Sequence, residues 1–408
     1  MDPKRVRRSR KAAELAYRLA ILPADVVDEI LLRLPAKSIA RFRAACKSWY
    51  ALFSDRVFLR AHHDHASRAV LLRKRSGPRS SYEWDDDICA LPFGQRAATP
   101  IGLKKLRRRC RFLLHGCCDG LLLLSQSHRP NYFLVYNPEH VPLPRDLNWN
   151  VAVAGFYFHA PTAEYRVLFY KCDRTERVRR LPPREQETVT RKHYDYSVAA
   201  VGWPEVRRLA SRTYGGYTRW KNNDAPAILH GCLHWMRMLH QVIVFDTVSE
   251  RFRGMRGPMQ DRCMVGRLVA MDDGKLGASS FAEGERTVDV WVLRDYRKET
   301  SWTLRCKVDV GFMGGGSVKF KWLGIAHVSE SGEALFYGAQ RYGVYNLRKG
   351  EVVRAGRKIF LFRKKDDRKI DARLSATWHV YRESLVSPVP KDVGAEPGLE
   401  FYVSGKFR

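Results

Sequence analysis

The chain has 408 residues, of which 45% are hydrophobic and 12% aromatic. This is enough apolar material for packed cores in two or three domains, and it excludes wholesale disorder. The 73 Lys and Arg outnumber the 43 Asp and Glu, so the formal net charge is +30. Such a charge favours acidic partners, whether phosphate backbones, anionic membranes or acidic proteins, and says nothing about the fold.

Residues 1–19 are predicted to be a basic disordered tail, since residues 1–20 hold seven basic and two acidic side chains. The tail is compatible with nuclear import and equally with a solvated leader. No apolar run approaches the ~20 residues that a membrane-spanning helix needs. Nine cysteines without regular spacing form no disulfide framework. We therefore expect a soluble protein of the cytoplasm, the nucleus or both, with no membrane contact.

Residues 20–66 carry the clearest helical pattern of the chain. Apolar residues recur at intervals of three and four: Val26, Val27, Ile30, Leu31 and Leu34, then Ile39, Phe42, Cys46 and Trp49. Pro23 suits a first helical turn, and Pro35 ends the first helix because it disfavours helical geometry at Leu34. We predict three short helices, whose apolar positions exceed what they can mutually cover. Part of that surface therefore needs an outside partner.

From residue 67 onward the pattern changes to short β-rich runs separated by turns. A valine followed by a turn recurs at five places: Val135, Val198, Val244, Val290 and Val344. Glycine-marked strands precede four of these valines, and the intervals between valines are 63, 46, 46 and 54 residues. A strand-rich unit of about 45–55 residues is typical of propeller blades. With further strands at Ala69–Leu72 and Tyr381–Val386, we predict a β-propeller of five to seven blades; a two-sheet sandwich is the alternative.

Two clusters could suggest a metal site, but each has a simpler interpretation. His62, His63 and His65 cannot all face one metal from the end of a helix, and they are interpreted as surface histidines. Glu83 and Asp85–Asp87 are not followed by EF-hand spacing, so an acidic turn is favoured. We predict no metal and no cofactor.

The sequence motifs that could suggest catalysis are incomplete. The glycine-rich Gly311–Ser317 has no P-loop lysine and is interpreted as a loop. Adjacent Cys117 and Cys118 have poor geometry for zinc. His115 and His230 both precede Gly-Cys, which we interpret as one repeat position with a structural role. We predict no catalytic residues.

The helical stretch LPADVVDEILLRLPAKSIARFRAACKSWYALFSDRVFLRAH closely resembles the F-box. The later segments HGCCDGLLLL, YNP, GCLHW, FDTVSERF, VDVWVLRDY and YRESLVSP resemble the F-box-associated domain of plant-type F-box proteins. The resemblance implies an α+β multidomain protein: a basic tail (1–19), an F-box (20–66), a β-propeller-like domain (67–390) and a C-terminal tail (391–408).

The resemblance also implies a non-catalytic adaptor. F-box proteins dock on a Skp-type adaptor, which links them to a cullin–RING ubiquitin ligase, and their C-terminal domain holds a protein substrate. On this basis the adaptor-binding residues are predicted to be Leu22, Pro23, Ile30, Leu31, Leu34, Pro35, Ile39 and Trp49. The net charge leaves open a basic nucleic-acid or chromatin binder, although no recognition motif accompanies it. A glycan-binding, lectin-like domain is a further alternative.

Overall fold

The computed structural model describes residues 23–75, 87–93, 97–100, 112–126, 129–137, 139–142, 151–180, 187–203, 205–215, 225–237, 241–258, 265–281, 286–313, 323–338, 341–358, 360–362, 369–370 and 373–384. The two predicted tails and the Glu83 cluster up to Asp86 lie outside these residues. The chain divides into two compact units. Unit 1 comprises Met1–Arg68 with Arg382–Val386, and unit 2 comprises Ala69–Tyr381 with Ser387–Arg408.

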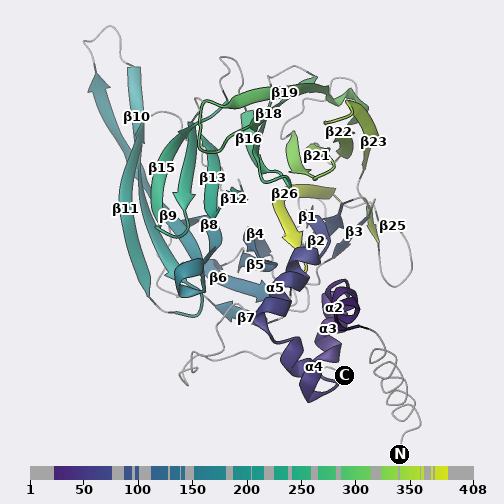
Figure 1. Ribbon diagram of the computed structural model, residues 1–408. Coiled ribbons are helices and arrows are strands. Elements are labelled where there is room, and N and C mark those ends of the chain that lie inside the picture. Colours follow the sequence, from purple (N-terminus) through teal and green to yellow (C-terminus); the bar gives the residue numbers. More distant parts are fainter. Residues whose placement is uncertain are drawn as a thin grey trace, which may run out of the picture. The chain divides into compact units, whose positions relative to one another are not determined.

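Within its described residues, unit 1 contains four short helices (Figure 1): α2 (Ala24–Leu32), α3 (Ala36–Phe42), α4 (Lys47–Leu52) and α5 (Arg56–His65). Pro23 and Pro35 hold extended backbone directly before α2 and α3. Cys46 caps α4 through its Sγ, which accepts a hydrogen bond from the Trp49 amide, and Asp55 caps α5 in the same way for Phe58. Our prediction of three helices was one short, because these two caps start separate helices where the apolar pattern continues.

An aromatic core holds these four helices together. Leu31, Ile39, Phe53 and Phe58 are buried at its centre. Trp49 packs edge-on against Phe53 with ring centroids 5.6 Å apart. Edge-to-face pairs of this kind add about 0.5–1.5 kcal/mol beyond the area they bury. All four helices therefore contribute to the core, and α4 does so through Trp49 and its C-cap residue Phe53.

Unit 2 is a six-bladed β-propeller, which confirms the predicted fold. Five blades are four-stranded antiparallel sheets in chain order. Blade 1 contains β4 (Phe112–Cys118), β5 (Leu121–Gln126), β6 (Arg129–Asn137) and β7 (Glu139–Pro142). Blade 2 contains β8 (Val151–His159), β9 (Glu164–Arg180), β10 (Glu187–Ala200) and β11 (Val206–Gly215). Blade 3 contains β12 (Ala227–Leu229), β13 (Cys232–Arg237), β14 (Gln241–Asp246) and β15 (Arg251–Arg256). Blade 4 contains β16 (Val265–Ala270), β17 (Leu276–Phe281), β18 (Thr287–Leu293) and β19 (Trp302–Asp309). Blade 5 contains β20 (Gly324–Val328), β21 (Glu333–Gly338), β22 (Arg341–Asn346) and β23 (Glu351–Lys358).

Blade 6 is assembled from both ends of unit 2. Its strand order is β25-β24-β3-β2-β1-β26. The strands are β1 (Arg68–Arg75), β2 (Asp87–Pro92), β3 (Ala97–Pro100), β24 (Phe360–Phe362), β25 (Lys369–Ile370) and β26 (Arg373–Arg382). Figure 1 shows β26, in yellow, beside β1, and the Thr377 hydroxyl donates a hydrogen bond of 2.8 Å to the Leu71 carbonyl. The predicted terminal strand Tyr381–Val386 was placed too late, because β26 begins at Arg373 and ends at Arg382.

Apolar clusters between neighbouring blades show that the ring closes. Ala69 and Leu71 of β1 pack with Leu122 of blade 1. Val70 and Leu72, which point to the other face of the same strand, pack with Leu335 and other residues of blade 5. Blade 6 therefore buries both faces, one against each neighbour. This packing makes the fold depend on residues more than 300 positions apart in the sequence.

The five recurring valines occupy one structural position, the third strand of blades 1 to 5. The glycine-marked turns also correspond, since Gly120, Gly231, Gly274 and Gly332 all join the first and second strands with positive φ. This is the backbone region that glycine enters without steric cost. The repeat read from the sequence is therefore the blade itself.

Candidate functional site

The first helix of unit 1, α2, is apolar on two sides. Val27 and Leu31 face the core, where Leu31 is buried. Val26 and Ile30 also lie one turn apart, but on a different side, and they are 39% and 40% exposed. A helix that buries one apolar stripe and exposes a second has a surface suited to a partner.

The structure divides the predicted adaptor-binding residues into groups. Pro23, Ile30 and Pro35 are exposed, Leu34 and Trp49 are half-buried, and Leu31 and Ile39 are buried in the core; Leu22 lies outside the described residues. We call Pro23, Val26, Ile30 and Pro35 the α2 surface. A partner can touch these four side chains directly, whereas Leu31 and Ile39 can act only by supporting the helices that carry them.

Two further exposed apolar residues of unit 1 were missed from the sequence. Val57 is 77% exposed near the start of α5, and Tyr50 is 54% exposed on α4. The packing of α5 accounts for Val57: Phe58 and His62, four residues apart, share the buried side of the helix, which leaves Val57 off that side. Both residues enlarge the apolar surface that unit 1 offers.

His62 has a structural role, contrary to the prediction that it is a surface histidine. Its side chain is buried, and its Nε2 donates a hydrogen bond of 2.7 Å to the Leu34 carbonyl. That carbonyl lies between α2 and α3, where the backbone leaves helical geometry. The bond therefore ties α5 to the segment between α2 and α3. Unit 1 is further held by Arg382, which donates to the Asp64 carbonyl at 2.9 Å.

His115 and His230 do not share a repeat position, so that interpretation was wrong. His115 lies on β4 and its Nε2 is hydrogen-bonded to the Ser125 hydroxyl at 2.6 Å. His230 instead sits in the turn after β12, in the place that Asp119 takes in blade 1. The Gly-Cys that follows both histidines misaligned the repeats by four residues. Burial lowers the pKa of His115 to about 4, so the side chain is uncharged at neutral pH.

The FDTVSERF segment forms an ion-pair network that joins blades 2 and 3. Glu250, buried in the turn between β14 and β15, accepts hydrogen bonds from the Tyr157 hydroxyl at 2.5 Å and from Arg166 at 2.9 Å, and it also pairs with Arg207. Its φ of +52° bends the turn so that the carboxylate reaches blade 2. Glu164 supplies a second carboxylate to Arg166 at 2.8 Å. The segment that resembles a family motif thus has an architectural role.

Within the part of the chain that the structure describes, no three His, Cys, Asp or Glu side chains are placed to hold a metal ion. None of the described helices has the length and apolar character to span a bilayer. The described residues of Gly311–Ser317 lie in a 3-10 helix, η3 (Val310–Met313), and the remainder falls outside the described residues.

Comparison with known proteins finds a match to the F-box domain and several F-box proteins similar over most of the chain. Residues 19–61, which include α2, α3 and α4, match the F-box domain. The chain is 24% identical over 323 residues to F-box protein At5g49610 of Arabidopsis thaliana, covering 70% of this chain and 80% of that protein. It is 28% identical over 285 residues to F-box protein At3g08750 of the same plant, covering 67% and 70%. It is 23% identical over 306 residues to the Arabidopsis F-box/kelch-repeat protein At3g23880, covering 69% and 78%. These matches confirm the resemblance predicted from the sequence.

Proposed function

We propose that this chain, an F-box protein whose second unit is a six-bladed β-propeller, is the substrate-recognition adaptor of an SCF-type cullin–RING ubiquitin ligase. Unit 1 docks on a Skp-type adaptor, and the propeller holds a protein target for ubiquitination. The chain itself is not catalytic, because the partners supply ubiquitin transfer. It acts in the cytoplasm, the nucleus or both.

The observation that carries this proposal is the α2 surface on a unit that matches the F-box domain. Val26 and Ile30 remain exposed although Leu31 and Ile39 already fill the core beneath them. Burial of apolar area is the dominant favourable term in most protein association. In the proposal, Leu22, Pro23, Ile30 and Pro35 contact the Skp-type adaptor, while Leu31, Leu34, Ile39 and Trp49 hold their helices in place.

The propeller suits the second half of the role, because loops on a rigid scaffold carry recognition in many folds. In blades 1 to 5 turns join the antiparallel strands, and pairing of β26 with β1 closes the ring. A target bound to loops of this ring would be held by a rigid domain while the ligase acts on it.

The test is reconstitution from purified parts. The intact chain should elute with a Skp-type adaptor as one complex in size-exclusion chromatography, and a variant lacking residues 22–65 should not. Addition of cullin, RING subunit and ubiquitin-conjugating enzyme should then place this chain in an active ligase. Absence of a complex between the intact, folded chain and the adaptor would refute the proposal.

The net charge of +30 favours one competing function, nucleic-acid binding. We expect that binding to be weak and to fade as salt is added, because dispersed surface charges are screened within about 8 Å at physiological ionic strength. Tight, sequence-selective binding at physiological salt would support the competing function instead.

A further inference from the structure

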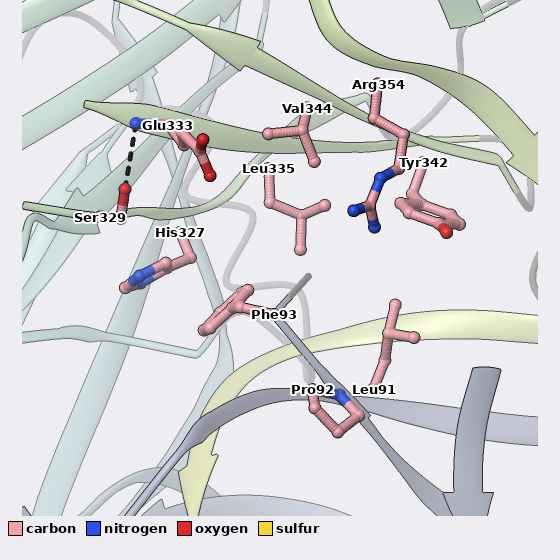
Figure 2. A pocket seen from close by; sticks show the side chains of 10 residues that line it. All are labelled: Leu91, Pro92, Phe93, His327, Ser329, Glu333, Leu335, Tyr342, Val344 and Arg354. Atoms are coloured by element: carbon pink, nitrogen blue, oxygen red, sulfur yellow. Dashed lines mark hydrogen bonds between the residues drawn. The ribbon is translucent and has the colours of Figure 1, made fainter. Parts of the chain in front are cut away.

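A cavity of about 40 Å³ lies between blades 5 and 6 of the propeller. Figure 2 shows the side chains that line it: Leu91, Pro92, Phe93, His327, Ser329, Glu333, Leu335, Tyr342, Val344 and Arg354. Blade 6 contributes the end of β2, and blade 5 contributes all four of its strands or their ends. The cavity is therefore a feature of the junction between blades.

The wall of this cavity is held in place before any ligand arrives. The Phe93 ring stacks on His327 with centroids 4.1 Å apart. The Nε2 of His327 lies 3.1 Å from the Asp272 carboxylate, and both side chains are largely buried. Leu91 and Leu335 form an apolar lining, with Leu91 2% exposed. Preorganised walls of this kind reduce the entropy that binding costs.

Irregular pairing in blade 5 directs Arg354 into the same space. Two register shifts flank Val344 in the pairing of β22 with β23, one on each side of it. Val344 is paired with Arg354 at that point, and both residues line the cavity. Bulges re-aim side chains and are over-represented next to functional sites. Figure 2 shows the guanidinium of Arg354 directed toward the space between Leu335 and Tyr342.

The size of the cavity decides the class of ligand. Pockets for cofactors and drug-sized molecules measure about 300–1,000 Å³, so a cavity of about 40 Å³ admits only the tip of one side chain. Blade 5, which supplies most of the lining, carries more positive than negative charge and so favours an acidic partner. The described residues of blade 5, 323–338 and 341–358, hold six Lys or Arg and three Asp or Glu, in a chain whose net charge is +30.

The two charged residues of the lining, Glu333 and Arg354, make the cavity electrostatically asymmetric. Figure 2 shows Glu333 and Arg354 on opposite sides of Leu335. A ligand carboxylate is attracted on the Arg354 side and repelled on the Glu333 side. A segment with an acidic residue on one side only of an apolar side chain fits this arrangement.

We propose that this cavity is a recognition pocket for a protein segment that inserts the tip of one aliphatic side chain between Leu91 and Leu335 and pairs a neighbouring Asp or Glu with Arg354. The inference rests on the proposed function and adds the chemistry of the target to it. The aliphatic residue supplies burial, and the carboxylate supplies a charge-assisted hydrogen bond that fixes orientation.

The experiment selects peptides from a displayed random dodecapeptide library on the full chain in complex with a Skp-type adaptor. Enriched peptides should share an aliphatic residue with Asp or Glu on one side. A labelled peptide from this set should lose affinity about tenfold or more with Arg354→Glu, and also with Val344→Phe, which fills the cavity. The matched control is Lys349→Glu, because Lys349 is in the same blade, 70% exposed and outside the lining; it should change the affinity less than about twofold.

Thermal unfolding of each variant shows whether the propeller is intact, and Arg354→Glu keeps the test decisive if Val344→Phe fails to fold. Failure to enrich this pattern, or equal losses with Arg354→Glu and Lys349→Glu, would overturn the inference. Preferential capture of a single-stranded RNA dodecamer through Arg354 would overturn it as well. If any of these results is obtained while the Skp-type adaptor still binds, the pocket proposal fails and the proposed adaptor function stands. If the unmodified chain does not bind the Skp-type adaptor, the proposed adaptor function itself is refuted.

Discussion

Removal of the apolar side chains of the α2 surface should weaken binding of the Skp-type adaptor without unfolding unit 1. The change is Val26→Ala with Ile30→Ala. These side chains are 39% and 40% exposed, so about two fifths of each remains to be buried by a partner. Complete burial of such a side chain is worth about 1.5–3 kcal/mol. The two truncations together should therefore cost roughly 1.2–2.4 kcal/mol of binding free energy, or about 7- to 50-fold in Kd.

The same change should have little effect on the free energy of unfolding. Alanine has a higher helix propensity than valine or isoleucine, which offsets part of the lost contact. Leu31→Ala gives the contrast, because Leu31 is 2% exposed and its truncation should cost about 2–5 kcal/mol of stability. Leu34→Ala is a less specific test, since Leu34 also packs against the core of unit 1.

The assay is titration of purified Skp-type adaptor into the full chain by calorimetry, with circular dichroism as the check on folding. The matched control is Val352→Ala with Val353→Ala on β23 of the propeller, where the valines are 46% and 44% exposed. That variant removes similar apolar surface from unit 2 and should leave the Kd unchanged. A Kd for the Val26 and Ile30 variant equal to that of the unmodified chain would refute the assignment of the α2 surface.

Three further predictions concern the propeller and the cysteines. Glu250→Ala should lower the free energy of unfolding by about 2–3 kcal/mol, as measured by urea denaturation. The reason is that the change removes one buried carboxylate from Arg166, while the carboxylate of Glu164 remains as its partner. Glu250→Gln should lower the free energy of unfolding by less. Burial lowers the pKa of His234 to about 4, whereas the ordinary pKa of histidine is about 6.5. Between these two pH values the unfolded chain binds a proton that the folded chain does not, so the free energy of unfolding should fall as the pH is lowered from 6.5 to 4. His234→Asn should reduce this dependence on pH, as measured by urea denaturation across that range. Iodoacetamide should modify the exposed Cys46 in the native chain and leave the buried Cys117 unmodified, as measured by mass spectrometry. Burial raises the pKa of the Cys117 thiol to about 12, so little reactive thiolate is present. Modification of both cysteines at similar rates would contradict the structure.

The sequence predicted those parts of the fold that depend on local pattern. The third-strand valines and the glycine turns recur because each blade must bury the same strand and make the same hairpin, so the interval between them is visible in one chain. The number of blades could not be read with the same certainty. Blade 6 depends on pairing of β1 with β26, and nothing local in either strand specifies a partner some 300 residues away.

The candidate sites were predictable to different degrees. Helical periodicity marked Ile30 and Leu31 alike as apolar, but only the packing of α3 and α5 decides that Leu31 is covered and Ile30 is not. The cavity between blades 5 and 6 was not predictable, since it depends on the register shifts beside Val344 that direct Arg354 inward. The alignment of His230 with His115 was wrong for a similar reason. Both histidines precede Gly-Cys in the sequence, but in the structure the turn at His230 corresponds to the turn at Asp119.

The separation of the two cores makes the two proposals independently testable. The core of unit 1 is built from Leu31, Ile39, Phe53 and Phe58, and none of these residues belongs to an apolar cluster of the propeller. Effects of substitutions with no shared contacts usually add. Combining the α2-surface variant with Arg354→Glu should therefore reduce adaptor and peptide affinities by the same factors as each change alone. A departure from additivity greater than about 0.5 kcal/mol would show that occupancy of one site is coupled to the other.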